Sequence, residues 1–515
     1  FDVQHYFAKL AGFFYIEDNI VKSGNQLMTL SDLQLLWENA MVKIKSVLKH
    51  HSEFAFFDPK DHLAFKETVS LFRTALESCG LFVRPLMEFL FSTREKFESL
   101  LFARLRKQIL SIKDREIYQS MTVSSIQQYK DQIEPYSLDV NARKRNSSRG
   151  VGDTDSRLEL SETKLDTPSM SGSDPSSGSN EFRFSFANDE EDIDDDDDAP
   201  KFPLTLPFSQ SVPLICYEMK QFVNDYELFS RNLPDMHSFV RRAVENALIH
   251  EVNKAFNEVI DNSRTTFSIS QASQIAINCT YLALACSYFR ELVESSRDSR
   301  VDELTTAKFS LAEELFFRTR TRCEDLIFEL VNTKLDEFLS LYWNVNWCPE
   351  KPSSRQNTFI DDLISYSETT FLCLLFMPKT IKEAVHFTSC KHISTYLMDF
   401  LCSNVKKFNI VSIYNLNSDL KALEQFAVGC PIDNLVDTFS EIRQLVDLFV
   451  SGNIEQILDK NIRLQKFPYL SPQKLILILE KYRNLGVFTS CPEGVINVKK
   501  RTVETVVKRL KLTDY

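Results

Sequence analysis

Apolar side chains recur every three or four residues along most of this chain, and this periodicity is what most limits its fold. In FSEIRQLVDLFVSGN (439–453) the apolar positions fall on one helix face. A second stripe runs through SDLQLLWENAMVKIKSVLKH (31–50), where Ser31 is the expected N-cap and Gln34 its capping-box partner. Pro85 is typical of the first turn of a further helix. The pattern predicts helices almost throughout.

Glycine usage supports the same conclusion. The 515 residues contain 11 glycines, and four of these (Gly150, Gly152, Gly172 and Gly178) fall in one short segment. The remainder has too few glycines for a fold built on hairpins or on Gly-rich phosphate loops. We therefore predict an all-α protein without a nucleotide-binding loop of that kind.

The acidic charge is concentrated in one segment. The whole chain has a net charge of −12, and residues 139–198 hold 17 acidic and 7 basic side chains, a net of −10. Such a Ser- and Asp-rich stretch buries too little apolar surface to offset the entropy of ordering it. We predict that it is disordered, either as a solvated insertion in a surface loop or as an acidic tail adjusted by phosphorylation of serines such as Ser173, Ser176 and Ser185.

The insert gives a first prediction. Deletion of residues 139–198 is expected to leave the melting temperature within about 2 °C of the parent, because loop length affects closure entropy only weakly. Calorimetry of the two chains measures this. A large destabilisation, or strong hydrogen-exchange protection in the segment, would contradict it.

Prolines mark a second boundary. Pro349 and Pro352 stop helix propagation within WNVNWCPEKPSSRQNT (343–358). The chain is expected to divide into four parts. These are a helical bundle over 1–136, the insert over 137–200, a helical bundle over 201–348 and a C-terminal helical bundle over 349–515.

Catalytic motifs are present only as fragments. His250-Glu251 begins a zincin-like HExxH, but Lys254 occupies the second histidine position. His386 and Cys390 share a helix face close to His392, which is at most half of a zinc site. We expect His250-Glu251 to be an ordinary helix-surface pair, and His386, Cys390 and His392 to line a buried or half-buried helix face. We predict no catalytic residues, no metal, no cofactor and no enzymatic activity.

The remaining composition indicates a reduced compartment and protein partners. Eleven cysteines occur without CxxC pairs, which is typical of buried thiols in a cytosolic protein. Outside the acidic insert the net charge is only about −2, which argues against a nucleic-acid partner.

Two surfaces remain candidates for binding. The helix over 439–450 carries a polar strip, in which Ser440, Glu441, Gln444 and Asp447 are either solvated or in contact with a partner. The final segment, VKKRTVETVVKRLKL (498–512), is a basic amphipathic helix with Val503, Val506, Val507 and Leu510 on one face. Its apolar face either packs on the last bundle or lies on an anionic membrane.

Seven segments, taken in order, closely resemble the Rab-binding subunit of the exocyst, the exocyst complex component six family. They are FAKLAGFFYIEDNI (7–20), FPLTLPFSQSVPLICYEMKQFV (202–223), TTFLCLLFMPKTIKEAVHFTSCKHIS (369–394), LNSDLKALEQFA (416–427), FSEIRQLVDLF (439–449), FPYLSPQKLILILEKYR (467–483) and VETVVKRLKL (503–512). The resemblance covers essentially the whole chain apart from the insert and corresponds to the C-terminal two thirds of the family. The upstream coiled-coil part would then be missing.

The resemblance implies a rod of consecutive helical bundles of the multisubunit tethering-complex type. It also implies a non-enzymatic subunit that joins secretory vesicles to the plasma membrane before fusion. Its expected partners are a Rab-family small GTPase in the GTP state, bound by the C-terminal bundle, and the other exocyst subunits. The alternative function is a lipid-binding adaptor that works through the basic C-terminal helix.

The resemblance also implies a cytoplasmic location, peripheral at vesicles and at plasma-membrane sites of polarised exocytosis. The long acidic insert departs from the animal pattern and favours a fungal origin, where those sites are growing tips or the division site. Because the resemblance assigns GTPase binding to the C-terminal bundle, our hypothesis is that Ser440, Glu441, Gln444 and Asp447 line part of the GTPase-contact surface, the alternative being that the strip faces solvent.

Overall fold

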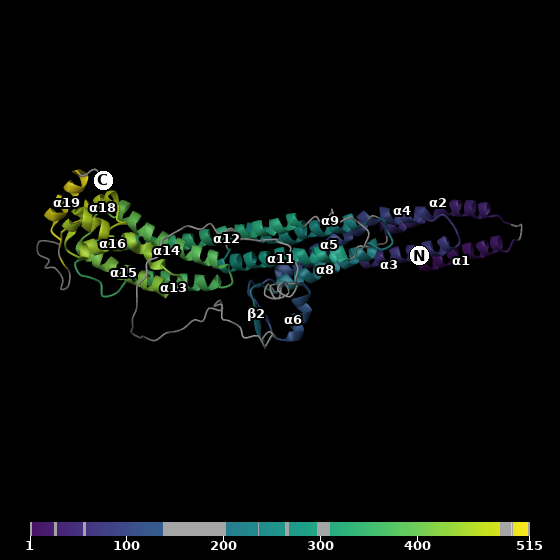
Figure 1. Ribbon diagram of the computed structural model, residues 1–515, viewed down its shortest axis with the longest axis horizontal. Coiled ribbons are helices and arrows are strands. Elements are labelled where there is room, and N and C mark those ends of the chain that lie inside the picture. The colour runs from purple at the N-terminus through teal and green to yellow at the C-terminus, as the bar shows by residue number, and fades with distance from the viewer. Residues whose placement is uncertain are drawn as a thin grey trace, which may run out of the picture. The chain divides into compact units, whose positions relative to one another are not determined.

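The computed structural model describes most of the chain outside the acidic insert. The described residues are 3–24, 28–54, 58–136, 138, 202–234, 236–262, 267–295, 309–484, 496 and 498–512. The predicted disorder of residues 139–198 concerns a segment that lies outside them. The described residues form helices almost throughout, so the all-α prediction is confirmed (Figure 1). No helix within these ranges combines the length and the apolar character needed to cross a bilayer.

The chain separates into a large unit, Phe1–Met121 with Leu206–Tyr515, and a small unit, Thr122–Thr205. In the small unit Ser125 caps α6 by accepting a hydrogen bond from the Gln128 amide. Tyr129 and Phe202 pack edge to face beside it. The elements from Thr122 to Leu206 are β1 (Met121–Val123), α6 (Ile126–Gln132), η1 (Glu134–Tyr136) and β2 (Leu204–Leu206), and β1 pairs with β2.

Among the described residues, the longer helices belong to the large unit. Before the small unit they are α1 (Val3–Lys22), α2 (Leu30–Phe54), α3 (Pro59–Ser78), α4 (Arg84–Ser92) and α5 (Arg94–Asp114). After it come α8 (Ser211–Ser230), α9 (His237–Ala247), η2 (Leu248–Asn253), α10 (Lys254–Asn262), α11 (Ile269–Ser295), α12 (Ser310–Leu339) and η4 (Ser340–Asn344). The C-terminal helices are α13 (Thr358–Cys373), α14 (Lys379–Ser403), α15 (Ile410–Gly429), η5 (Leu435–Phe439), α16 (Ser440–Val450), η6 (Ile454–Leu458), α17 (Lys460–Lys466), α18 (Pro472–Leu479) and α19 (Lys500–Leu512).

The apolar stripe of α2 packs as expected, although its cap is different. Leu33, Trp37, Met41, Ile44 and Leu48 are buried, and the Trp37 indole donates a 2.7 Å hydrogen bond to the carbonyl of residue 82. The capping box is formed by Thr29 and Asp32, whose side chains each accept a hydrogen bond from the other's backbone amide. The expectation of Ser31 as N-cap and Gln34 as its partner was therefore wrong, because the helix begins at Leu30.

Helix α3 links the N-terminal helices to the middle of the unit. Its His62 is fully buried, with ring centroids 5.5 Å from Phe97 on α5 and 5.8 Å from Phe229 on α8. One turn later the Lys66 ammonium donates hydrogen bonds to the carbonyls of residues 228 and 231, at the end of α8. A cation at a helix C-terminus satisfies exposed carbonyls and opposes the helix dipole.

The middle of the unit is built around the pair α11 and α12, which lie side by side along most of their lengths (Figure 1). Small buried residues on α11, including Ala276, Cys279 and Ala283, allow the two backbones to approach closely. A buried amide, Asn278, bonds to both the amide and the hydroxyl of Ser209, before α8. Asn278 and Ser209 thus satisfy each other's polar groups within this core.

The predicted break near Pro349 is present, since no helix runs from Asn344 to Thr358. The segment between them is held by α15 and by the residue that precedes it. Asn409 donates to the carbonyl of residue 349 at 2.8 Å, and the Asn415 side chain accepts from the amide of residue 353 at 2.7 Å. Helix contacts also continue across the break, from α11 and α12 to α13 and α14. The boundaries at 136, 200 and 348 stay predictions.

One buried carboxylate, that of Asp419, also fixes the segment between η4 and α13. Asp419 on α15 is 1% exposed, and its oxygens accept from the Tyr342 hydroxyl at 2.9 Å, from the Asn357 amide at 2.7 Å and from the Asn357 side chain at 2.6 Å. Burial raises the pKa of this carboxyl, and the three hydrogen bonds act in the opposite direction. Asp419 therefore ties η4 and the first turn of α13 to α15.

Candidate functional site

The polar strip of α16 lies in the C-terminal helices, between α15 and the segment that leads into α18. Its apolar side is packed as predicted, with Phe439, Ile442, Leu445, Val446 and Phe449 all buried. Among the four candidate residues, Asp447 is exposed, and Ser440, Glu441 and Gln444 are half-buried. The strip is therefore accessible mainly at Asp447.

Two candidate residues bind neighbouring parts of the same chain. The Glu441 carboxylate lies 3.2 Å from the Lys474 ammonium on α18, and its side chain is 17% exposed. The Gln444 side-chain oxygen accepts a 2.9 Å hydrogen bond from the Tyr469 amide. Glu441 holds α18 against α16, and Gln444 holds the segment before α18. The fold therefore accounts for at least part of the polarity of these two residues.

On the other side of the strip, Arg443 joins α16 to α15. Its guanidinium forms a two-pronged ion pair with Glu424, donates to Asn417 at 2.6 Å and lies 3.6 Å from Asp447. Partial burial raises the pKa of the Asp447 carboxyl, and Arg443 acts in the opposite direction. The sequence analysis did not single out Arg443. Its spacing four residues before Asp447 was the available signal.

A shallow groove of about 570 Å³ adjoins the first turn of α16. Phe387, Thr388, Lys391, His392 and Thr395 line it from α14, and Thr438 lines it from η5. The same face of α14 continues to Asp399, whose carboxylate lies 3.8 Å from the Lys474 ammonium that also pairs with Glu441. The groove and the strip are consequently parts of one continuous surface.

His386, Cys390 and His392, which in sequence make at most half of a zinc site, have separate surroundings. His386 is buried and stacks on Phe371 with ring centroids 3.6 Å apart, and burial lowers its pKa. Burial raises the pKa of Cys390 to about 12, and His392 instead lies 2.7 Å from the Asp336 carboxylate. Within the described ranges, no three His, Cys, Asp or Glu side chains are grouped as a metal site requires.

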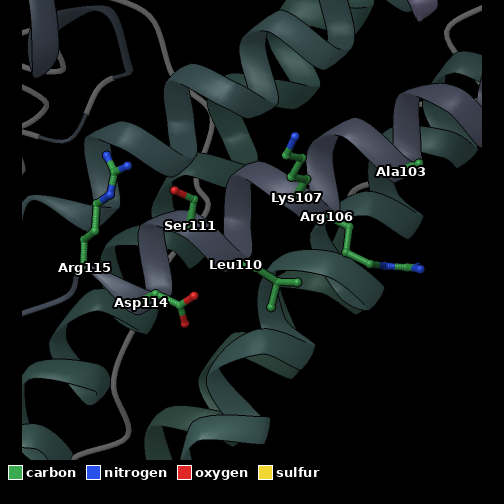
Figure 2. Close-up of a pocket in the computed structure, with 7 residues that line it drawn as sticks. All are labelled: Ala103, Arg106, Lys107, Leu110, Ser111, Asp114 and Arg115. Atoms are coloured by element: carbon green, nitrogen blue, oxygen red, sulfur yellow. The ribbon is translucent and has the colours of Figure 1, made fainter. Parts of the chain in front are cut away.

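A second hollow follows one exposed face of α5 (Figure 2). Its lining residues recur at helical spacing, and their charged side chains leave α5 in different directions: Ala103, Arg106, Lys107, Leu110, Ser111, Asp114 and Arg115. Arg106 also forms a bidentate ion pair, at 2.6 and 2.8 Å, with Glu251 in the wide π-helical turn η2. Glu251 is 7% exposed, so the expectation that it lies on the helix surface was wrong.

The basic C-terminal helix α19 packs on the last bundle. Val503, Val506, Val507 and Leu510 are all buried, and α19 contacts α18 and η6. A helix whose apolar side is covered in this way cannot insert that side into a membrane without detaching from the bundle. The packing alternative is the one that the structure adopts.

These features define an all-α helical-bundle protein whose accessible surfaces are faces of single helices and the grooves beside them. The family model "Exocyst complex subunit Sec15 C-terminal" matches residues 181–481. The chain belongs to this family, and the resemblance to exocyst complex component six is confirmed.

Curated relatives match along nearly the whole chain. It is 26% identical to exocyst complex component SEC15A of Arabidopsis thaliana, over 99% of this chain and 59% of that protein. It is 24% identical to exocyst complex component 6B of Homo sapiens, over 98% of this chain and 57% of that protein. The chain thus spans less than two thirds of the length of these relatives.

The solved structures include a similar chain, the crystal structure of the Sec15 C-terminal domain. The two are 21% identical, and the match covers 71% of this chain and 99% of that one with a TM-score of 0.40.

Proposed function

We propose that this protein is a non-enzymatic exocyst subunit that tethers secretory vesicles to the plasma membrane before fusion. The observation that carries the proposal is its membership of the Sec15 family, with similarity to exocyst components along nearly its whole length. Its partners are then the other exocyst subunits, and its place is cytoplasmic and peripheral at sites of exocytosis. Purification of the tagged full-length protein with its bound partners tests this directly, and recovery of no exocyst subunit would contradict it.

We further propose that the C-terminal helices bind a Rab-type GTPase in its GTP state. The surface suited to this is the strip Ser440, Glu441, Gln444 and Asp447 together with the adjoining groove between α14 and η5. It combines an exposed carboxylate at Asp447 with an exposed aromatic ring at Phe387, which is 37% exposed, and a cation at Lys391. Aromatic anchors surrounded by polar groups are typical of the energetic centres of interfaces. GTPase switch segments are ordered only in the GTP state, which provides the nucleotide dependence.

The most direct test of this surface is a substitution at Asp447, the exposed residue of the strip. Asp447→Lys reverses one charge at the strip, and it is expected to weaken binding of a GTP-loaded Rab by about 1–3 kcal/mol if Asp447 is a central contact. Titration against a panel of Rab GTPases in both nucleotide states measures the effect. Asp325→Lys, at an exposed Asp on α12, is the matched control and should bind like the parent. Equal affinity of the two variants would remove Asp447 from the interface.

The double variant Glu441→Ala with Gln444→Ala is expected to weaken GTP-dependent binding by a similar amount, about 1–3 kcal/mol. It also deletes the contacts to Lys474 and to the Tyr469 amide, so a loss of stability of about 1–2 kcal/mol accompanies it. Thermal unfolding of the variant separates the two effects. Phe387→Ala, in the groove, removes an exposed ring without those contacts and gives an independent measure of binding.

A further inference from the structure

Positive charge gathers at the C-terminal end of the chain. Residues 460–512 contain twelve Lys and Arg against three Asp and Glu, a net of +9 in a chain whose total is −12. Figure 1 shows α19, the most basic part of this segment, beside α18 at the C-terminal end. The nearly neutral average outside the acidic insert therefore conceals a strongly basic region.

The cations of α19 fall into two groups, one near the packed side of the helix and one on its outward side. Lys500 pairs with Glu504 at 3.5 Å and Lys511 pairs with Glu480, and both lie toward the buried edge of the helix. Arg501, Thr505, Lys508 and Leu512 recur at i, i+4, i+7 and i+11, and all four are exposed. This row is opposite the buried valines and contains no acidic side chain. Arg509 is exposed on one flank of the row and Glu504, the partner of Lys500, on the other. Lys499, which is also exposed, precedes the first residue of the helix.

We propose that this outward face, the α19 basic face of Arg501, Lys508 and Arg509 together with Lys499 just before the helix, binds an anionic phospholipid bilayer through charge alone. The buried valines hold α19 on the bundle, so the helix presents its cations without giving up its packing. A cation near an anionic membrane surface contributes about tenfold or less to binding, and several act together. The face lies on a single helix whose opposite side is packed on the bundle, so it fits an extended charged surface.

This contact goes beyond the proposed GTPase binding and does not depend on it. The membrane would be bound by α19 and the GTPase by α14 and α16, so one C-terminal bundle would hold two partners. It also differs from the adaptor alternative of the sequence analysis, in which the apolar face of the helix entered the membrane.

Vesicle flotation without any GTPase tests the proposal. The parent chain is expected to float with vesicles of equal parts phosphatidylcholine and phosphatidylserine, but not with phosphatidylcholine alone, and to be released by high salt. The variant Lys499→Gln, Arg501→Gln, Lys508→Gln is expected to bind about 100-fold more weakly, at about fivefold per cation. Because these side chains are exposed, its melting temperature should match that of the parent.

The matched control removes three exposed cations elsewhere, as Lys9→Gln, Lys43→Gln, Lys45→Gln on α1 and α2, and should float like the parent. Equal flotation of the α19 variant and the control overturns the proposal. Flotation with phosphatidylcholine alone would also overturn it, because binding would then be apolar. Capture on immobilised polyglutamate without any flotation would show that the face serves an acidic protein instead. GTPase affinity, measured on the same variants, reports separately on the proposed function.

Discussion

Replacement of Asp419 by Ala is expected to lower the free energy of unfolding by about 3 kcal/mol or more. The change leaves the Tyr342 hydroxyl and two Asn357 donors without their acceptor in a site where the side chain is 1% exposed. Each buried donor that loses its partner costs about 1–3 kcal/mol. Denaturant unfolding of the two chains measures the difference.

Asp419→Asn is the matched control for this prediction. Its amide oxygen still accepts from the Asn357 backbone amide, and its NH₂ group donates to the Tyr342 hydroxyl, which accepts as well as donates. The Asn357 side chain, which donates to the same Asp419 oxygen in the parent, flips so that its own oxygen accepts from this NH₂ group. The cost should be less than half that of the Ala variant, because burial of the charge is also relieved. A loss in unfolding free energy below about 1 kcal/mol for Asp419→Ala would contradict this prediction. It would show that water enters the site and replaces the carboxylate as hydrogen-bond acceptor.

Acidification is expected to destabilise the protein through His62. Burial lowers the pKa of this imidazole from 6.5 to about 4, with a smaller contribution from the charge of Lys96. The unfolded chain then binds more protons than the folded one between these two values. Stability from the neutral imidazole is complete above pH 6.5 and is lost as the pH falls toward 4. The full loss is about 3 kcal/mol, at 1.36 kcal/mol per pKa unit.

His62→Phe keeps an aromatic ring among Phe65, Phe97 and Phe229 and removes the titrating group. The difference in stability between parent and variant should therefore depend on pH between 4 and 6.5 and be constant above that range. Parallel stability curves across the whole range would show that His62 does not titrate on unfolding.

Much of the fold could be predicted because each helix carries its own apolar stripe. The buried face of α16 and the buried valines of α19 follow directly from spacing. The N-cap predicted for α2 was two residues too late. In sequence, Thr29 with Asp32 and Ser31 with Gln34 are both acceptable capping pairs. Choosing between them depends on which residue enters the helix, which the local sequence does not decide.

The candidate site shows the limit of the same reasoning more clearly. The sequence places Glu441 and Gln444 on a polar strip, but their partners Lys474 and Tyr469 are 33 and 25 residues away. Likewise Glu251 reads as a surface residue until the wide turn η2 directs it toward Arg106, 145 residues earlier in the chain. Long-range partners of polar groups are set by packing, and helical periodicity contains no information about them.

The segment between α12 and α13 has a mechanical consequence for a protein proposed to act as a tether. A tether under tension transmits force along its backbone, and a loose linker would extend before the helices on either side felt any load. Here Asn409, Asn415 and Asp419 fasten the segment to α15 and the residue before it through side-chain hydrogen bonds. A force on the C-terminal helices is therefore transmitted to α12 through these hydrogen bonds before the segment can extend. The same hydrogen bonds should be among the first contacts to break when the force is large.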